Sequence, residues 1–166
     1  RRDGDALTLT LSEPQTTLEI ETEINPAANS ELSGLYASAD TLCTQCEPEG
    51  FRRITYFLDR PDVLSVYRVT LRALKGQYPV LLSNGNHVGE GEDGQYHYAI
   101  WEDPYPKPSY LFALVAGPLQ FIEDRFTTTS GRDVQLRIYA RSRDIPQCDF
   151  ALSALRDAML WDEKVY

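Results

Sequence analysis

The ten residues SVYRVTLRAL (65–74) decide the fold class, because apolar and polar side chains alternate along them. One set of alternate positions is apolar and the other is polar: Tyr67, Val69, Leu71 and Ala73 against Arg68, Thr70 and Arg72. Successive side chains of a β-strand point to opposite faces of the sheet. The stretch is therefore predicted to be a strand with one buried face and one solvated face.

The same period of two recurs along most of the chain and predicts an all-β domain of sandwich or saddle type. We expect further strands at 7–11, 17–24, 96–101, 110–116, 119–127 and 134–140, with turns at EGEDG (90–94) and TSGRD (129–133). In PVLLSNGNHV (79–88), Asn84 and Gly85 separate two extended stretches. An Asn-Gly pair tolerates positive φ, so it predicts a tight hairpin.

Prolines and a helical stripe mark two exceptions to this pattern. EDPYPKPSY (102–110) has three prolines, which donate no backbone hydrogen bond, so it is predicted to be a stiff connection rather than a central strand or a helix. After Pro146 the apolar residues Leu152, Leu155 and Met159 recur every three or four positions. This spacing predicts a helix with Asp149 as its N-cap. Its apolar stripe, extended by Trp161 and Tyr166, needs a surface to pack on, and we expect the helix to belong to a following domain.

Length, charge and cysteine content exclude several classes of protein. The 166 residues suit one domain that buries roughly 70% of its unfolded surface. A net charge of -9 argues against nucleic acid as a partner. No apolar run approaches the ~18 residues of a membrane span, and the first residues lack the apolar core of a signal peptide. Three cysteines are an odd set for a disulfide-bonded secreted domain, so we expect reduced thiols and a cytoplasmic location.

The thiols and imidazoles give weak signals for chemistry. Cys43 and Cys46 form a Cys-x-x-Cys pair, but a zinc site needs four ligands and the remaining candidates do not supply a second spaced pair: Cys148, His87 and His97. A redox pair would open a helix in a βαβ unit, which is not predicted here. We therefore expect a structural role for the cysteines and strand or surface positions for the histidines.

The acidic residues after the cysteine pair leave two interpretations open. Glu47 and Glu49 flank Pro48 and precede Gly50, which is typical of a solvated turn. Basic and acidic residues follow that could form a local ion-pair network around the loop: Arg52, Arg53, Asp59 and Arg60. Exposed pairs of this kind contribute only about 0–1 kcal/mol each. Residue chemistry alone does not decide between a solvated turn and a substrate-reading loop.

A resemblance adds to this interpretation. Residues 44–47 (TQCE), Arg52 and residues 57–61 (FLDRP) resemble the signature of the zinc aminopeptidase N family in its N-terminal β domain. Further segments in the same order resemble the Gram-negative bacterial branch: GLYAS (34–38), EGFR (49–52), LLSNGN (81–86), DPYPKPSYLFALVAG (103–117), FTTTSGR (126–132) and WDE (161–163). The resemblance covers nearly the whole chain and is least distinct before Ser33.

The resemblance implies roles for particular residues. In the family, the Glu at position 47 receives the free α-ammonium of a peptide substrate, and Gln45 contacts the first substrate residue. Arg52 and Asp59 are expected to shape the loop. The family binds Zn2+ through a His-Glu-x-x-His helix and a downstream Glu, and neither that motif nor Gly-x-Met-Glu-Asn occurs here. No residue of this chain is therefore expected to be catalytic or to bind the metal.

These implications define the expected domains and partners. Residues 1–146 are expected to form the β domain, truncated at its start, and 147–166 the first helix of the catalytic domain. The expected partners are that catalytic domain and peptide N-termini, with self-association possible through exposed strand edges. The alternatives are a stand-alone non-catalytic β-sandwich that binds or scaffolds a partner, and a thiol-redox protein acting through Cys43 and Cys46.

Overall fold

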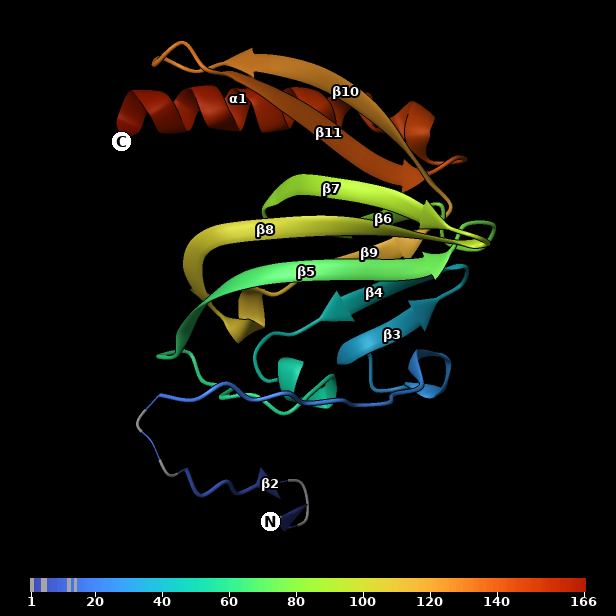
Figure 1. The fold of residues 1–166 in the computed structure, drawn as a ribbon. Helices are drawn as coiled ribbons and strands as arrows, with labels where there is room; N and C mark the ends of the chain where they lie inside the picture. Colours follow the sequence, from blue (N-terminus) through green and yellow to red (C-terminus); the bar gives the residue numbers. More distant parts are fainter. Residues whose placement is uncertain (1, 4–5, 12, 14) are drawn as a thin grey trace. The chain divides into compact units, whose positions relative to one another are not determined.

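The computed structural model describes residues 2–3, 6–11, 13 and 15–166. The chain divides into two compact units, Arg1–Gly117 and Pro118–Tyr166. Along the described residues β-strands predominate, and the chain ends in one α-helix, α1 (Asp149–Val165) (Figure 1). The predicted class, an all-β fold with one C-terminal helix, is confirmed. None of the helices in the described part of the chain is long and apolar enough to span a membrane.

The first unit contains two main antiparallel sheets. One has the strand order β3-β4-β9-β6 and the other the order β5-β8-β7, while β1 and β2 pair separately. The strands are β1 (Arg2–Asp3), β2 (Ala6–Leu7), β3 (Gly34–Ser38), β4 (Thr41–Gln45), β5 (Leu64–Leu74), β6 (Val80–Ser83), β7 (Asn86–Asp93), β8 (Tyr96–Pro108) and β9 (Leu114–Gly117). Three short 3-10 turns connect them: η1 (Pro26–Ala28), η2 (Phe51–Arg53) and η3 (Ser109–Leu111).

The core of this unit lies between the two sheets. Each sheet supplies two of its buried residues. Leu71 of β5 and Ala99 of β8 come from one sheet, and Leu81 of β6 and Ala116 of β9 come from the other. In Figure 1, β5 and β8 lie in front of β9 and β6. Strand β5 follows the predicted alternation, with Tyr67 and Leu71 buried and Arg68 and Arg72 exposed. Burial of these apolar faces drives the two sheets together.

The proline-rich stretch is part of a strand, so its prediction as a connection is wrong. β8 runs on through Pro108, and its pairing with β5 is interrupted after Asp103 by a register shift and resumes at Lys107, opposite Ser65. β7 pairs with β8 only as far as Glu102. Beyond that point β8 has one neighbour, and a proline is tolerated in a strand that leaves one edge free.

The hairpin predicted at Asn84 and Gly85 is also wrong, because β6 pairs with β9 whereas β7 pairs with β8. The dipeptide is a corner between the two sheets. Gly85 has φ +87°, and a Cβ there would lie 2.2 Å from the carbonyl oxygen of Glu102. The Asn84 amide donates to the Leu111 carbonyl at 3.1 Å and accepts from the Ala113 amide at 2.6 Å. These contacts direct the chain into the second sheet.

Three other predicted strands are absent or only partly present. Of residues 7–11 only Leu7 is in a strand, and residues 17–24 are extended without strand pairing. Leu18, Ile20 and Ile24 remain 38–51% exposed. Alternation predicts a strand only where a neighbour supplies backbone partners, and here the described contact is one hydroxyl bond from Thr22 to the Ile54 carbonyl. The strand predicted at 110–116 begins at Leu114, after η3.

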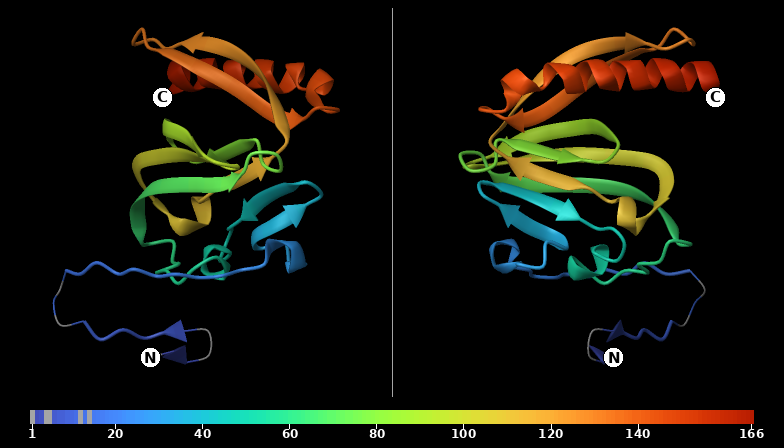
Figure 2. Two further views of the ribbon diagram at one scale, coloured as in Figure 1. Left: turned by 45° about the vertical axis from the view of Figure 1, so that its right-hand side comes forward. Right: turned by 180° about the vertical axis from the view of Figure 1, so that it is seen from behind.

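The second unit is a hairpin with a helix packed on it. Strands β10 (Leu119–Thr127) and β11 (Asp133–Arg141) pair antiparallel, and η4 (Ile145–Gln147) leads into α1. Figure 2 shows α1 lying along one face of this hairpin. The half-buried residues on α1 include the predicted stripe: Leu152, Leu155 and Met159. The hairpin supplies buried Phe126 and Leu136.

The ends of α1 differ from the sequence prediction. The N-cap is Cys148, without a side-chain capping bond, and Asp149 is the first helical residue instead of the cap. Its carboxylate still lies in the first turn, where the helix dipole favours negative charge. Trp161 is 58% and Tyr166 92% exposed, so neither extends the packed stripe. Assignment of 147–166 to a following catalytic domain stays a prediction.

Candidate functional site

The candidate site is the loop that follows β4, residues 46–60, here called the Glu47 loop. Thr44 fixes the end of β4, because its hydroxyl accepts from the Leu114 amide at 2.9 Å. Cys46 is buried, and its carbonyl accepts from the Gly50 amide at 2.8 Å, which closes a turn around Glu47. A Cβ on Gly50 would lie 2.2 Å from the Gln45 carbonyl oxygen. Only glycine fits at this closing position.

Aromatic packing holds the Glu47 loop against the sandwich. Phe51 is buried against Tyr67 of β5. Its ring also meets Phe57 and Phe112 edge-on, with centroids 5.1 Å apart in both cases. Edge-to-face pairs contribute about 0.5–1.5 kcal/mol each beyond the burial of their area. Phe51 therefore joins the loop to the sandwich.

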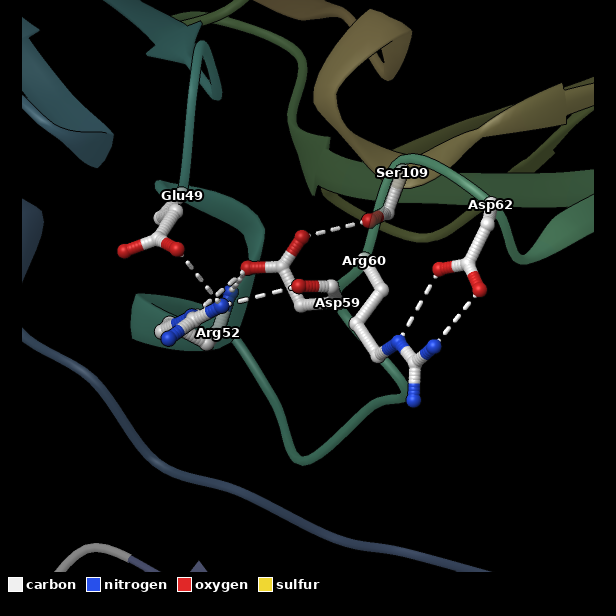
Figure 3. Close-up of polar contacts among 6 residues, drawn as sticks. All are labelled: Glu49, Arg52, Asp59, Arg60, Asp62 and Ser109. Carbon is white, nitrogen blue, oxygen red and sulfur yellow. Dashed lines mark hydrogen bonds and ion pairs between the residues drawn. The ribbon is translucent and has the colours of Figure 1, made fainter.

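A buried carboxylate near the end of the loop is bonded to the middle of the loop (Figure 3). Asp59 has a side chain only 3% exposed, and its Oδ2 accepts from both the backbone amide and the Nε of Arg52, each at 3.0 Å. The other oxygen, Oδ1, accepts from the Ser109 hydroxyl at 2.5 Å. The Arg52 Nη2 also donates to the Asp59 carbonyl at 2.8 Å. By contrast, the neighbouring Arg60–Asp62 pair is exposed.

The environment of Asp59 sets its ionisation. Burial acts to raise the pKa of Asp59, but hydrogen bonds from Ser109 and from the side chain and amide of Arg52, with the Arg52 charge, outweigh it. The pKa is held below its ordinary value, and the carboxylate is ionised at neutral pH. Because the folded state prefers the ionised form, this preference stabilises the fold above the ordinary Asp pKa of about 4 and is lost below it.

An acid titration checks this ionisation. We expect the difference in free energy of unfolding between the wild-type chain and Asp59→Asn to be constant from pH 7 to about pH 5 and to shrink as the pH falls through about 4 toward the depressed pKa. Chemical unfolding at pH 7, 5 and 3 measures it. A difference that stays the same at pH 3 would show that Asp59 is not the titrating group.

Glu47 and Glu49 differ in their electrostatic surroundings. Both are exposed, but Glu49 Oε1 lies 3.5 Å from the Arg52 Nη2 and forms an ion pair. Within the described part of the chain, no hydrogen bond or ion pair engages the Glu47 carboxylate. Gln45 is exposed beside it, and its Nε2 donates to the Glu47 carbonyl at 3.3 Å. The loop thus presents one unpaired carboxylate next to one amide, a combination suited to a cationic group that donates hydrogen bonds.

Among the thiols and imidazoles only Cys46 is part of the Glu47 loop, and the others lie in β4, β7 and β8 and directly before α1. All three cysteines are free, and burial together with the Asp59 charge raises the pKa of Cys46 to about 11. Thiolate chemistry is therefore disfavoured at Cys46. His87 and His97 lie in β7 and β8, as predicted. Their respective contacts are the Trp101 ring and the Tyr78 carbonyl.

The described residues do not fit a zinc centre. Across residues 2–3, 6–11, 13 and 15–166, no group of three or more His, Cys, Asp or Glu side chains could hold a metal ion. A catalytic zinc needs three protein ligands and an open position. The zinc that the resemblance implies would need ligands from outside this chain.

Sequence reasoning missed two residues that support the Glu47 loop. Ser109 is 1% exposed and bonds Asp59 across fifty positions of sequence, and Phe112 packs on Phe51. Both lie in or beside the stretch expected to be a stiff connection. A small polar residue directly after a proline carries no signal of burial, so only the fold brings Ser109 to the site.

Comparison with known proteins identifies the class. Residues 1–111 match the Peptidase M1 N-terminal domain. The chain belongs to this family, and the resemblance seen at residues 44–47 and 57–61 is confirmed.

Two bacterial aminopeptidases have about half of their aligned residues identical to those of this chain. Aminopeptidase N of Escherichia coli is 49% identical over 165 residues, which cover 99% of this chain and 19% of that protein. Aminopeptidase N of Haemophilus influenzae is 51% identical over 168 residues, covering 98% and 19%. The chain thus spans about a fifth of the length of these relatives.

Solved structures agree with this assignment. The crystal structure of Legionella pneumophila aminopeptidase A in complex with aspartic acid has a TM-score of 0.80 and 43% identity, over 83% of this chain and 16% of that chain. An M1 zinc metallopeptidase from Deinococcus radiodurans has a TM-score of 0.60 at 17% identity, over 74% of this chain and 28% of that chain, and shows the shared fold.

Proposed function

We propose that this chain is the N-terminal β domain of a zinc-dependent aminopeptidase and that Glu47, with Gln45, forms the subsite for the free α-amino group of a peptide. One observation carries the proposal: Glu47 is the carboxylate left unpaired at the end of β4, while Glu49 beside it is engaged by Arg52. A protonated amine supplies the charge and the hydrogen-bond donors that this carboxylate lacks.

Recognition of an ammonium explains how such an enzyme would select peptide ends. A charge-assisted hydrogen bond contributes about 1.5–3 kcal/mol. An internal amide or a blocked terminus offers no positive charge, so the carboxylate would be desolvated without compensation. Arg52 and Asp59 keep the loop in shape, and the zinc and the catalytic residues come from the rest of the longer protein. Residues 147–166 are its first catalytic-domain helix in this proposal.

The proposal extends to location and partners. Three free cysteines support a reducing compartment, and we place the protein in the cytoplasm. The partners are its own catalytic domain and peptide N-termini, with self-association of the separated chain through sheet edges such as β3 and β6. The stand-alone scaffold remains the alternative, and the raised pKa of Cys46 disfavours the thiol-redox alternative.

Activity of the full-length protein tests this function. We expect turnover of aminoacyl chromogenic substrates that a chelator abolishes and zinc restores, with N-acetylated forms of the same substrates hydrolysed at least about tenfold more slowly, the loss of one charged hydrogen bond. The isolated 166-residue chain is the control and should show no turnover. Equal hydrolysis of free and acetylated substrates would rule out an α-amino subsite.

A further inference from the structure

Residues 109–114, here called the backing segment, contact the Glu47 loop at two points and the preceding strand β4 at a third. The Ser109 hydroxyl donates to Asp59 Oδ1, the Phe112 ring meets Phe51 at 5.1 Å, and the Leu114 amide donates to Thr44 Oγ1 at 2.9 Å. These three contacts reach the end, the middle and the start of the loop region. One six-residue segment therefore contacts the chain on both sides of the turn that carries Glu47.

The backing segment is itself fixed at both ends. Pro108, directly before it, pairs with Leu64 of β5, and Leu114 begins β9 in the other sheet. Between these ends, Asn84 contacts the Leu111 carbonyl and the Ala113 amide. The segment thus spans the two sheets of the sandwich, and its position is set by both.

Ser109 is the polar contact among the three that is fully removed from water. Its residue exposure is 1%, and Asp59 beside it is 7% exposed. Figure 3 shows its hydroxyl directed at the carboxylate oxygen that Arg52 leaves open. A buried hydroxyl that donates to a carboxylate is costly to remove, since the acceptor is left without a partner.

We propose that Ser109 is a positioning residue for the α-amino subsite: by holding Asp59, it fixes the Glu47 loop against the sandwich in the orientation that binds the substrate ammonium. This inference rests on the proposed function. Ser109 touches no substrate group, and its effect passes through Asp59 and Arg52 to the turn. Loss of the Ser109 hydroxyl keeps the Glu47 carboxylate but leaves it poorly oriented toward the substrate ammonium.

The test uses the full-length enzyme and two inhibitors, a hydroxamate with a free α-amino group and the matching hydroxamate without it. We expect Ser109→Ala to raise KM for aminoacyl substrates about three- to tenfold with kcat nearly unchanged, as for loss of binding shared by ground and transition states. The Ki of the amino hydroxamate should rise in proportion, and that of the deamino hydroxamate should not. Ser109→Cys keeps a small donor and should recover part of the loss.

Control variants separate this role from a general loss of stability. Thr41 is a buried residue whose hydroxyl also donates to an aspartate, at the opposite end of β4. Thr41→Val should leave the ratio of the two Ki values unchanged. In the double variant Ser109→Ala/Glu47→Gln, the Ser109→Ala substitution should add little to the effect of Glu47→Gln alone, because both act on one interaction.

The outcomes distinguish the inference from the proposed function. If Glu47→Gln changes the ratio and Ser109→Ala does not, or if their effects add fully, the positioning role is wrong and the subsite stands. If Glu47→Gln leaves the ratio unchanged, the subsite itself is wrong. Should Ser109→Ala fail to fold, Asp59→Asn weakens the same hydrogen bond from its acceptor side, and an unchanged ratio there overturns the inference.

Discussion

Replacing Glu47 by glutamine in the full-length enzyme is expected to lower kcat/KM for substrates with a free α-amino group by about 10- to 150-fold. This range corresponds to one charge-assisted hydrogen bond of about 1.5–3 kcal/mol. The substitution keeps the shape and removes the charge. Because Glu47 is exposed and its carboxylate makes no described contact, the thermal stability should not change.

Glu49→Gln is the matched control for this prediction. Glu49 is two residues away, is 67% exposed and carries the same charge, but it is paired with Arg52. We expect its replacement to leave kcat/KM within about twofold, since an exposed ion pair contributes little. Equal losses in both variants would mean that the loop acts only through its overall negative charge, and the assignment to Glu47 would be wrong.

Replacing Asp59 by alanine is expected to destabilise the chain by about 2–3 kcal/mol, because buried Ser109 loses its acceptor and Arg52 loses a charged partner. Breaking a fully buried ion pair costs about 3–5 kcal/mol. The loss of stability expected here is smaller, because Arg52 is 48% exposed and water solvates it. For a chain of this length the midpoint Tm should fall by about 4–12 °C.

Asp62→Ala provides the comparison for Asp59. Asp62 forms two hydrogen bonds to Arg60, but both side chains are more than 60% exposed. We expect no measurable change in Tm, because surface pairs exchange protein contacts for water contacts. A loss of stability as large as that of Asp59→Ala would show that the depth of burial does not decide the effect in this loop.

The sequence predicted the fold where side-chain periodicity reports burial directly. β5, β10 and β11 were predicted within one residue at each end, since their alternation matches one packed face and one solvated face. Periodicity does not predict a strand correctly where the presence of a neighbouring strand decides whether the segment joins a sheet. Residues 17–24 alternate as well as β5 does, but they lack the neighbouring strand that would make them part of a sheet.

Turn and proline signals proved harder to interpret. Asn84 and Gly85 correctly mark a change of direction, but whether the two flanking strands pair depends on contacts with residues 111–113, far away in sequence. Pro104, Pro106 and Pro108 were expected to end strand pairing. Pairing with β5 is interrupted after Asp103 but resumes at Lys107 and Pro108, in a part of β8 whose other edge is not paired with β7.

Only the part of the candidate site that lies within the sequence motif was predicted. Residues 44–47 and 57–61 located the loop, and acids beside Pro48 and Gly50 indicated a turn. Which acid remains unpaired depends on the direction taken by Arg52, and that is set by Asp59. Asp59 in turn depends on Ser109, which no local pattern connects to the loop.

The central claim is that the Glu47 carboxylate faces the substrate ammonium, and an inhibitor pair measures this most directly. The Ki values of an amino hydroxamate and its deamino counterpart are compared in the wild-type enzyme and in Glu47→Gln. The account predicts that the substitution raises the Ki of the amino compound by about 10- to 150-fold and leaves that of the deamino compound unchanged. An equal change in both values, or no change in either, would contradict it.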